Sequence, residues 1–203
     1  MKSRILVFAR APVPGRCKTR LIPALGTIGA ARLHRRLVLR TVAAAHATGV
    51  AVELWCTPDA RHPLFQACRR NFGSRLRRQP PGDLGRKMAW ALTRVLYEGA
   101  ETVVLVGTDC PSLHASDLNQ ALSRLKQGSD CVLQGSTDGG YVLIGARRIP
   151  RRALAGIAWS SGHEGAQTRR RLRRFNLTCA ELEPRTDVDT PADYRRLRRR
   201  GVL

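Results

Sequence analysis

The chain has 203 residues, 43% of them hydrophobic, and a formal net charge of +21. This length and apolar content fit one folded domain, which we expect to span residues 1–203, and they exclude a generally disordered chain. No apolar run approaches the roughly 20 residues that cross a bilayer, and the N-terminal run lacks a signal-peptide cleavage site. We therefore expect no membrane span and a cytoplasmic location.

Cysteines and basic residues are both spread widely through the chain. The six cysteines form no CxxC pair and no Cys/His cluster with zinc spacing, so we expect neither a disulfide framework nor structural zinc. The 36 basic residues extend from Lys2 to Arg200, with runs at 147–152, 169–174 and 195–200. Such a charge suits nucleic acid or an anionic membrane, or it is an ordinary Arg-rich surface.

In chain order, the first half predicts strands alternating with helices. Residues 4–9 read as a buried strand, and apolar residues with helical spacing follow from Leu33 to Ala45, before a stop at Gly49. Further expected elements are a strand at 50–56, a short helix within 60–73, a weak strand at 74–79, a helix over 84–96 and a buried strand at 101–107.

The second half continues the pattern with a helix at 115–127, strands at 130–136 and 141–146, a helix at 164–175 and a strand at 178–183. A last helix follows Thr190, a good N-cap, with Pro191 at its first position. This alternation predicts an open, largely parallel α/β sheet covered on both faces. In such sheets ligands bind beyond the carboxyl ends of strands.

The loop after the first strand is basic and stiff. It contains Arg10, Arg16, Lys18 and Arg20, together with two prolines and Gly15, which permits a tight turn. Cationic side chains and free backbone N–H groups suit a diphosphate or triphosphate, although the loop is no Walker motif. A plain surface loop with solvated charges is the alternative.

Acidic residues follow two other strands. Asp109 comes directly after the buried strand 101–107, and Asp187 and Asp189 lie two residues apart, so that an extended backbone points both the same way. Carboxylate oxygens suit Mg²⁺ or Mn²⁺, so these three residues could form a metal site. Turn and capping chemistry is the alternative for each of them.

Two glycine-containing segments also stand at strand or helix starts. Asp138 precedes two glycines that allow close approach of a ligand, or that form a hairpin turn. Asp83 could cap the helix over 84–96 or contact a sugar or base. A nucleophile motif such as GxSxG is absent, and His163 with Glu164 reads more simply as a structural pair.

Together these segments resemble a known family. FARAPVPGRCKTRL, GDLGRKM, GTDCPSL, TDGGYVLIG, Trp159–Ser160 and DVDTPADY occur in the family's order between residues 8 and 194. The chain resembles small bacterial GT-A-like glycosyltransferases of the nucleotide-diphospho-sugar transferase superfamily, a family associated by name with arsenosugar biosynthesis. The resemblance implies a three-layer α/β/α sandwich, with a mostly parallel sheet and some antiparallel pairing.

The resemblance also implies roles for individual residues. Asp138 would be a general base on the acceptor hydroxyl, and Lys18 a catalytic cation. Nucleotide binding would fall to Ala11, Pro12, Gly15, Arg16, Lys18, Arg20, Asp83 and Asp109, acceptor binding to Gly139, Gly140, Tyr141 and Trp159, and Mg²⁺ or Mn²⁺ binding to Asp109, Asp187 and Asp189. Asp109 is followed by Cys-Pro rather than by a second aspartate, so the two-carboxylate motif of larger glycosyltransferases is incomplete.

Three functions fit this pattern. The first is glycosyl transfer from a nucleotide-diphospho-sugar to a small-molecule acceptor with divalent metal assistance. The second is a nucleotidyltransferase that couples an NTP to a phosphorylated small molecule, since the three cations of RCKTRL, namely Arg16, Lys18 and Arg20, suit a triphosphate. The third is a basic, non-enzymatic RNA-binding protein on a degenerate transferase fold. Aromatic residues are only 5% and are not interleaved with the Arg runs, so nucleic acid is not the expected partner.

Overall fold

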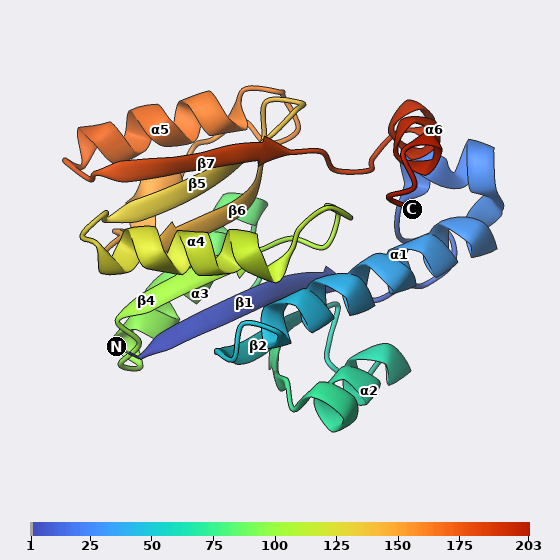
Figure 1. Cartoon of the computed structure of the whole chain (residues 1–203), viewed down its shortest axis with the longest axis horizontal. Helices are drawn as coiled ribbons and strands as arrows, with labels where there is room; N and C mark the ends of the chain where they lie inside the picture. Colours follow the sequence, from blue (N-terminus) through green and yellow to red (C-terminus); the bar gives the residue numbers. More distant parts are fainter. Residues whose placement is uncertain (1) are drawn as a thin grey trace.

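The computed structural model describes residues 2–203, which form a seven-stranded sheet with helices packed on it (Figure 1). The strands are β1 (Ser3–Arg10), β2 (Ala51–Thr57), β3 (Arg75–Arg78), β4 (Thr102–Val106), β5 (Cys131–Ser136), β6 (Tyr141–Ala146) and β7 (Cys179–Arg185). The α-helices are α1 (Ile22–His46), α2 (Pro63–Phe72), α3 (Leu84–Tyr97), α4 (Ala115–Lys126), α5 (Glu164–Arg174) and α6 (Pro191–Arg199). Short 3-10 helices η1 (Thr19–Leu21) and η2 (Arg151–Leu154) complete them.

The strand order is β3-β2-β1-β4-β6-β5-β7. All neighbouring strands are parallel except β6, which is antiparallel to both β4 and β5. The reversal follows from the turn at residues 137–140, which joins β5 to β6 as a hairpin. The predicted mostly parallel sheet with some antiparallel pairing is confirmed.

Two apolar layers enclose the sheet. On one face β1, β2 and β4 pack against buried residues of α1, α2 and α4, among them Val38, Phe65 and Leu122. On the other face the sheet packs against α3, η2 and α5 through Leu92, Leu154 and Leu172. The predicted three-layer α/β/α sandwich is therefore confirmed.

Helix α1 starts earlier than the apolar stripe from Leu33 indicates, and its N-terminal part runs past the end of the sheet (Figure 1). It bends at Gly26, whose φ of +67° is left-handed backbone that favours glycine. A third apolar cluster joins α1 to α6 through Leu33 and Leu197, and it also contains Leu21 of η1 and Val188 before α6. The segment before α6 is thereby held beside the carboxyl ends of the central strands.

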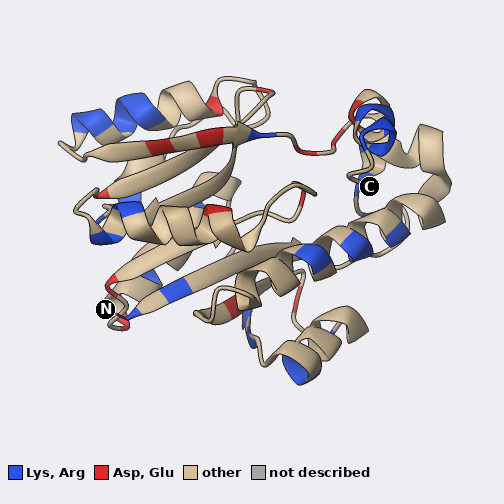
Figure 2. Cartoon of the chain, viewed as in Figure 1, with Lys and Arg blue, Asp and Glu red and all other residues tan. Residues whose placement is uncertain are grey.

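Charge is unevenly distributed over the elements. Basic residues lie along α1, α5 and α6, whereas acidic residues occupy β7 and the connection from β7 to α6 (Figure 2). None of the helices within residues 2–203 combines the length and the apolar character needed to span a membrane.

Candidate active site at the carboxyl edge of the sheet

An open cleft of about 970 Å³ lies where β1, β2 and β4 end, beside the turn from β5 to β6. The connections that follow β1, β4, β5 and β7 all contribute side chains to it, together with the start of α3 and the 159–164 segment. This is the edge at which open α/β sheets bind ligands. Of the residues predicted from the sequence, those that line the cleft are Arg16, Lys18, Arg20, Asp109, Asp138, Gly140, Tyr141, Trp159, Asp187 and Asp189.

The loop after β1 is fixed by its own backbone. The N–H of Ala11 donates to the carbonyl of Thr57 at 2.8 Å, and the N–H of Arg16 donates to the carbonyl of Val13 at 3.0 Å. Gly15 makes the tight turn between them with a φ of +76°. Arg16 is exposed, so this loop presents a cation to solvent at the cleft.

Three of the predicted nucleotide-binding residues are not part of the cleft lining that residues 2–203 form: Ala11, Pro12 and Gly15. A fourth, Asp83, is the N-cap of α3, where its carboxylate accepts the backbone N–H of Arg86 at 2.8 Å. The capping alternative for Asp83 is thus what the structure shows, and a nucleotide contact stays a prediction.

Lys18 is the cation of this loop that is not exposed. Its side chain is only 5% accessible, and its ammonium lies 2.6 Å from Asp109 Oδ1 and 2.8 Å from Asp189 Oδ1. It also donates to the carbonyl of Val188 at 2.7 Å. Burial alone would lower the pKa of Lys18, but the two carboxylates outweigh it and raise the pKa above its ordinary value.

Three carboxylates gather in the cleft beside Lys18. Asp138, Asp187 and Asp189 each place an oxygen within 4.8 Å of the others, a spacing that one divalent cation could bridge. Burial, together with the charges of Asp138 and Asp189, raises the pKa of Asp187 to about 7. Such a raised pKa reflects burial first, and then the mutual repulsion of carboxylates that share the site.

The predicted metal set and the observed cluster differ in one member. Asp109, predicted as a ligand, pairs with Lys18, whereas Asp138, predicted as a general base, lies with Asp187 and Asp189. The expectation that Asp187 and Asp189 project together agrees with the cluster. The catalytic and metal roles themselves stay predictions.

The turn that carries Asp138 is held by hydrogen bonds of its own carboxylate. Asp138 Oδ1 accepts the hydroxyl of Ser136 and the backbone N–H of Gly140. Gly139 was expected to make room for a ligand, but the chain's own backbone occupies that room. A Cβ on Gly139 would lie 1.9 Å from the carbonyl oxygen of Gly162, so glycine is required there for the two loops to touch.

Two aromatic side chains form the far wall. The rings of Tyr141 and Trp159 meet edge to face with their centroids 6.1 Å apart, and both line the cleft. Gly85, in the first turn of α3, lets the Trp159 ring approach, because a Cβ there would lie 2.9 Å from it. The predicted acceptor residues therefore sit on a preformed surface.

Other cleft residues were not singled out from the sequence. His34, buried in α1, contacts the carbonyl of Arg10 through Nε2 at 3.0 Å, and Gln79 donates to the carbonyl of Trp55 at 2.9 Å. Lys87 of α3 lines the cleft as well. Glu164, by contrast, is predicted from the sequence, with His163, to be a structural residue; it is buried and accepts the N–H of Ser161 at 2.7 Å. The sequence gives no sign that His34 and Gln79 line a cleft, because a single His in an apolar helix and a Gln after a weak strand are both common.

The fold and the cleft define the class of this protein. Over 98% of this chain and 87% of the other, the structure matches that of a "putative nucleotide-diphospho-sugar transferase" from Desulfovibrio desulfuricans G20, with 30% sequence identity and a TM-score of 0.91. The chain thus has the nucleotide-diphospho-sugar transferase fold. It belongs to the family described as "Uncharacterized protein conserved in bacteria (DUF2064)", whose model matches residues 39–161. No curated protein matches the sequence significantly.

More distant structures share the fold. CMP:2-keto-3-deoxy-manno-octonic acid synthetase complexed with CTP is 15% identical, with a TM-score of 0.57 over 99% of this chain and 98% of that one. Glucosyl-3-phosphoglycerate synthase from Mycobacterium tuberculosis, complexed with Mn²⁺, UDP and glucosyl-3-phosphoglycerate, is 12% identical, with a TM-score of 0.53 over 99% of this chain and 77% of that one. At these identities the likeness concerns the fold alone.

Proposed function

We propose that this protein is a transferase that moves a glycosyl group from a nucleotide-diphospho-sugar to a small acceptor, with the help of a divalent metal ion. The observation that carries the proposal is the cleft itself, whose lining combines exposed cations with a carboxylate cluster at the carboxyl edge of the sheet. Diphosphate release requires neutralisation of the leaving group, which positioned cations and one metal ion can supply.

The exposed cations are the proposed diphosphate ligands. Arg10, Arg16 and Arg20 line the cleft and, within residues 2–203, form no ion pair with a carboxylate. Arginine binds phosphate oxygens in pairs through its planar donor fork, so three free guanidinium groups suit a diphosphate. Tyr141 and Trp159 would then face the sugar or the acceptor.

The donor set fits a divalent ion. Asp138, Asp187 and Asp189 offer hard carboxylate oxygens, which Mg²⁺ and Mn²⁺ prefer. When bound, the ion would supply positive charge to the departing diphosphate. Asp138 is also the predicted general base, and the D138N variant separates the two roles, because lost Mn²⁺ binding marks a ligand and lost turnover alone marks a base.

Glycosyl transfer is favoured over nucleotidyl transfer by the state of Lys18. The case for an NTP depends on the three cations of RCKTRL, and the ammonium of Lys18 is already paired with Asp109, Asp189 and the carbonyl of Val188. Of the RCKTRL cations, only Arg16 and Arg20 stay free to bind phosphate, which suits a diphosphate better than a triphosphate. The relative at 30% identity also bears the nucleotide-diphospho-sugar transferase name, whereas the CTP-bound synthetase is only 15% identical.

The test is a screen followed by product analysis. UDP-, GDP-, dTDP- and CDP-sugars and the matching NTPs are compared by thermal shift with Mn²⁺ or EDTA, since saturating ligand stabilises the native state by roughly 2.7 kcal/mol at 100 times its dissociation constant. Phosphorus NMR then shows whether nucleoside diphosphate or pyrophosphate accumulates.

Nucleoside diphosphate from one sugar donor is the expected product, and pyrophosphate from an NTP would establish the nucleotidyltransferase instead. R20M should weaken donor binding, whereas R174M, which removes an exposed arginine at the end of α5, should not. Equal thermal shifts with every polyanion would show that the cleft binds anions without specificity, and would contradict the proposed function.

A further inference from the structure

The ammonium of Lys18 is surrounded by oxygens of the protein itself: it donates hydrogen bonds to Asp189 and to the carbonyl of Val188, and it forms an ion pair with Asp109. A protonated lysine has three N–H donors and no acceptor. Three oxygens lie within 2.8 Å of Lys18 Nζ, namely Asp109 Oδ1, Asp189 Oδ1 and the carbonyl of Val188. With its side chain 5% accessible and these three oxygens around it, the ammonium can contact a phosphate only if it gives up one of these partners.

Lys18 and its three partners come from three connections that are far apart in the sequence. Lys18 lies after β1, Asp109 after β4, and Val188 and Asp189 after β7. The N–H of Val188 also donates to the carbonyl of Asp109 at 2.9 Å, so the last two connections touch directly. Lys18 itself is held in left-handed backbone, with a φ of +47°, which a non-glycine residue adopts only when its surroundings require it.

We propose that Lys18 is a positioning residue that acts as the resident cation of the carboxylate cluster: it fastens three strand-end connections and limits how tightly the cluster takes up a divalent ion. The inference rests on the metal site of the proposed function. It departs from a phosphate-binding role, which the sequence alone suggests for a lysine in a basic loop.

The reason is competition for Asp189. This carboxylate pairs with Lys18 and also belongs to the cluster with Asp138 and Asp187. A metal ion at the cluster meets the repulsion of the nearby ammonium and must share Asp189 with it. Charges a few ångströms apart at a partly buried site interact strongly enough to change an affinity by tenfold or more. Removing the positive charge of Lys18 should therefore tighten metal binding.

The experiment measures Mn²⁺ binding without any donor, by following the free-ion signal in electron paramagnetic resonance. K18M should bind Mn²⁺ at least about tenfold more tightly than the wild type, a change of about 1.4 kcal/mol. It should also melt at a lower temperature in EDTA, with much of the loss recovered by Mn²⁺. K126M removes a lysine charge from the exposed end of α4 and should bind Mn²⁺ as the wild type does.

Each other outcome is decisive. K18M with unchanged or weaker Mn²⁺ affinity overturns the proposal, and so does a variant that binds donor poorly but Mn²⁺ normally, since that marks a phosphate ligand. If K18M is unfolded in EDTA, K18Q, which keeps an amide donor, is measured beside it. Folding of either variant on Mn²⁺ addition supports the proposal, and failure of both to fold with Mn²⁺ overturns it.

The result is separable from the proposed function. Should the wild type bind no Mn²⁺ while K18M does, metal assistance in the proposed reaction fails and the resident-cation role stands. Should neither protein bind Mn²⁺, the resident-cation role fails, and the donor screen still decides between glycosyl and nucleotidyl transfer.

Discussion

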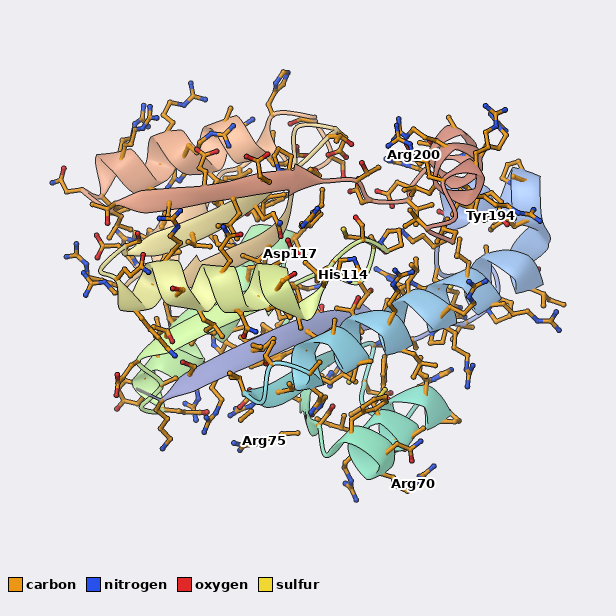
Figure 3. The ribbon with its side chains drawn as sticks, in the orientation of Figure 1. Arg70, Arg75, His114, Asp117, Tyr194 and Arg200 are labelled. Atoms are coloured by element: carbon orange, nitrogen blue, oxygen red, sulfur yellow. The ribbon has the colours of Figure 1, made fainter. Side chains whose placement is uncertain are left out.

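The guanidinium of Arg185, at the end of β7, meets the carboxylate of Asp117 in the first turn of α4, with Nη2 2.6 Å from Oδ1. Asp117 is 3% exposed, and its other oxygen accepts the backbone N–H of His114 at 2.9 Å (Figure 3). Gln134 of β5 donates to the same carboxylate at 2.9 Å. This network of polar contacts joins α4, β5 and β7. Because Arg185 lies two residues before Asp187, the network fixes the position from which the chain enters the carboxylate cluster.

Breaking this pair from one side should be strongly destabilising. R185M leaves the buried carboxylate of Asp117 without its cation, and we expect a loss of about 2–4 kcal/mol in urea unfolding. The double variant D117N/R185M should lose less than the sum of the single losses, since the two side chains interact directly. R196M, which breaks the exposed pair with Asp193, should cost less than about 1 kcal/mol. Similar losses for R185M and R196M would show that the buried pair has no special weight.

A second prediction concerns the contact between the turn after β5 and the 158–163 segment. In G139A the new Cβ would lie 1.9 Å from the carbonyl oxygen of Gly162, so one loop must move. We expect a loss of more than about 2 kcal/mol in unfolding free energy, together with weaker Mn²⁺ binding through displaced Asp138.

Gly99 supplies a matched control for that substitution. Its φ of +91° is nearly the same as the +92° of Gly139, but nothing lies within 4 Å of its Cβ position. G99A thus carries only the backbone strain of a left-handed alanine, about 1 kcal/mol. Equal losses for G139A and G99A would mean that the loop contact contributes nothing.

The fold could be read from the sequence largely because local patterns agree with the tertiary structure. The buried strand predicted at 101–107 is β4, Asp138-Gly-Gly does turn β5 into β6, and Thr190 caps α6 through the N–H of Asp193. The rule that parallel strands place their carboxyl ends together also brought the loops after β1, β4 and β7 to one edge.

What the sequence could not supply is how side chains pair across that edge. The charge of Lys18 suggests a phosphate ligand, and only the packing of Val188 against α1 and α6 brings Asp189 to it. Asp117 looks like an ordinary helix-start residue, and its long-range partner Arg185 is 68 positions away. Gly139 resembles a ligand-facing glycine until the 158–163 segment is placed. These relations depend on tertiary contacts that carry no local periodicity.

Asp130 gives a prediction for acid conditions. Its buried carboxylate is held by Arg148 and by the N–H and hydroxyl of Thr178, and these partners lower its pKa to about 2. Because the folded-state pKa lies below the unfolded value, its contribution is present above about pH 4 and is lost as the pH falls towards 2. D130N should lower the free energy of unfolding by about 1 kcal/mol at pH 7, a small value because solvent screens the exposed Arg148. The difference from the wild type should disappear near pH 2. Urea unfolding from pH 7 to pH 2 measures it, and a gap independent of pH would contradict the assignment.

Asp187 should show the opposite dependence. Its pKa of about 7 in the folded protein lies above the ordinary 3.8, because burial and the neighbouring carboxylates disfavour its charged form. The folded state therefore binds this proton more tightly than the unfolded chain, and stability decreases as the pH rises from about 4 to 7. In EDTA, D187N should be more stable than the wild type by about 1–3 kcal/mol at pH 8, with the difference vanishing below about pH 4.

Mn²⁺ should reverse the order of stability of D187N and the wild type, because the ion stabilises the wild type through a carboxylate that the amide replaces. A D187N protein that is less stable than the wild type in EDTA at pH 8 would contradict this prediction. It would show that the three carboxylates do not repel one another in the folded protein, although their spacing indicates that they should.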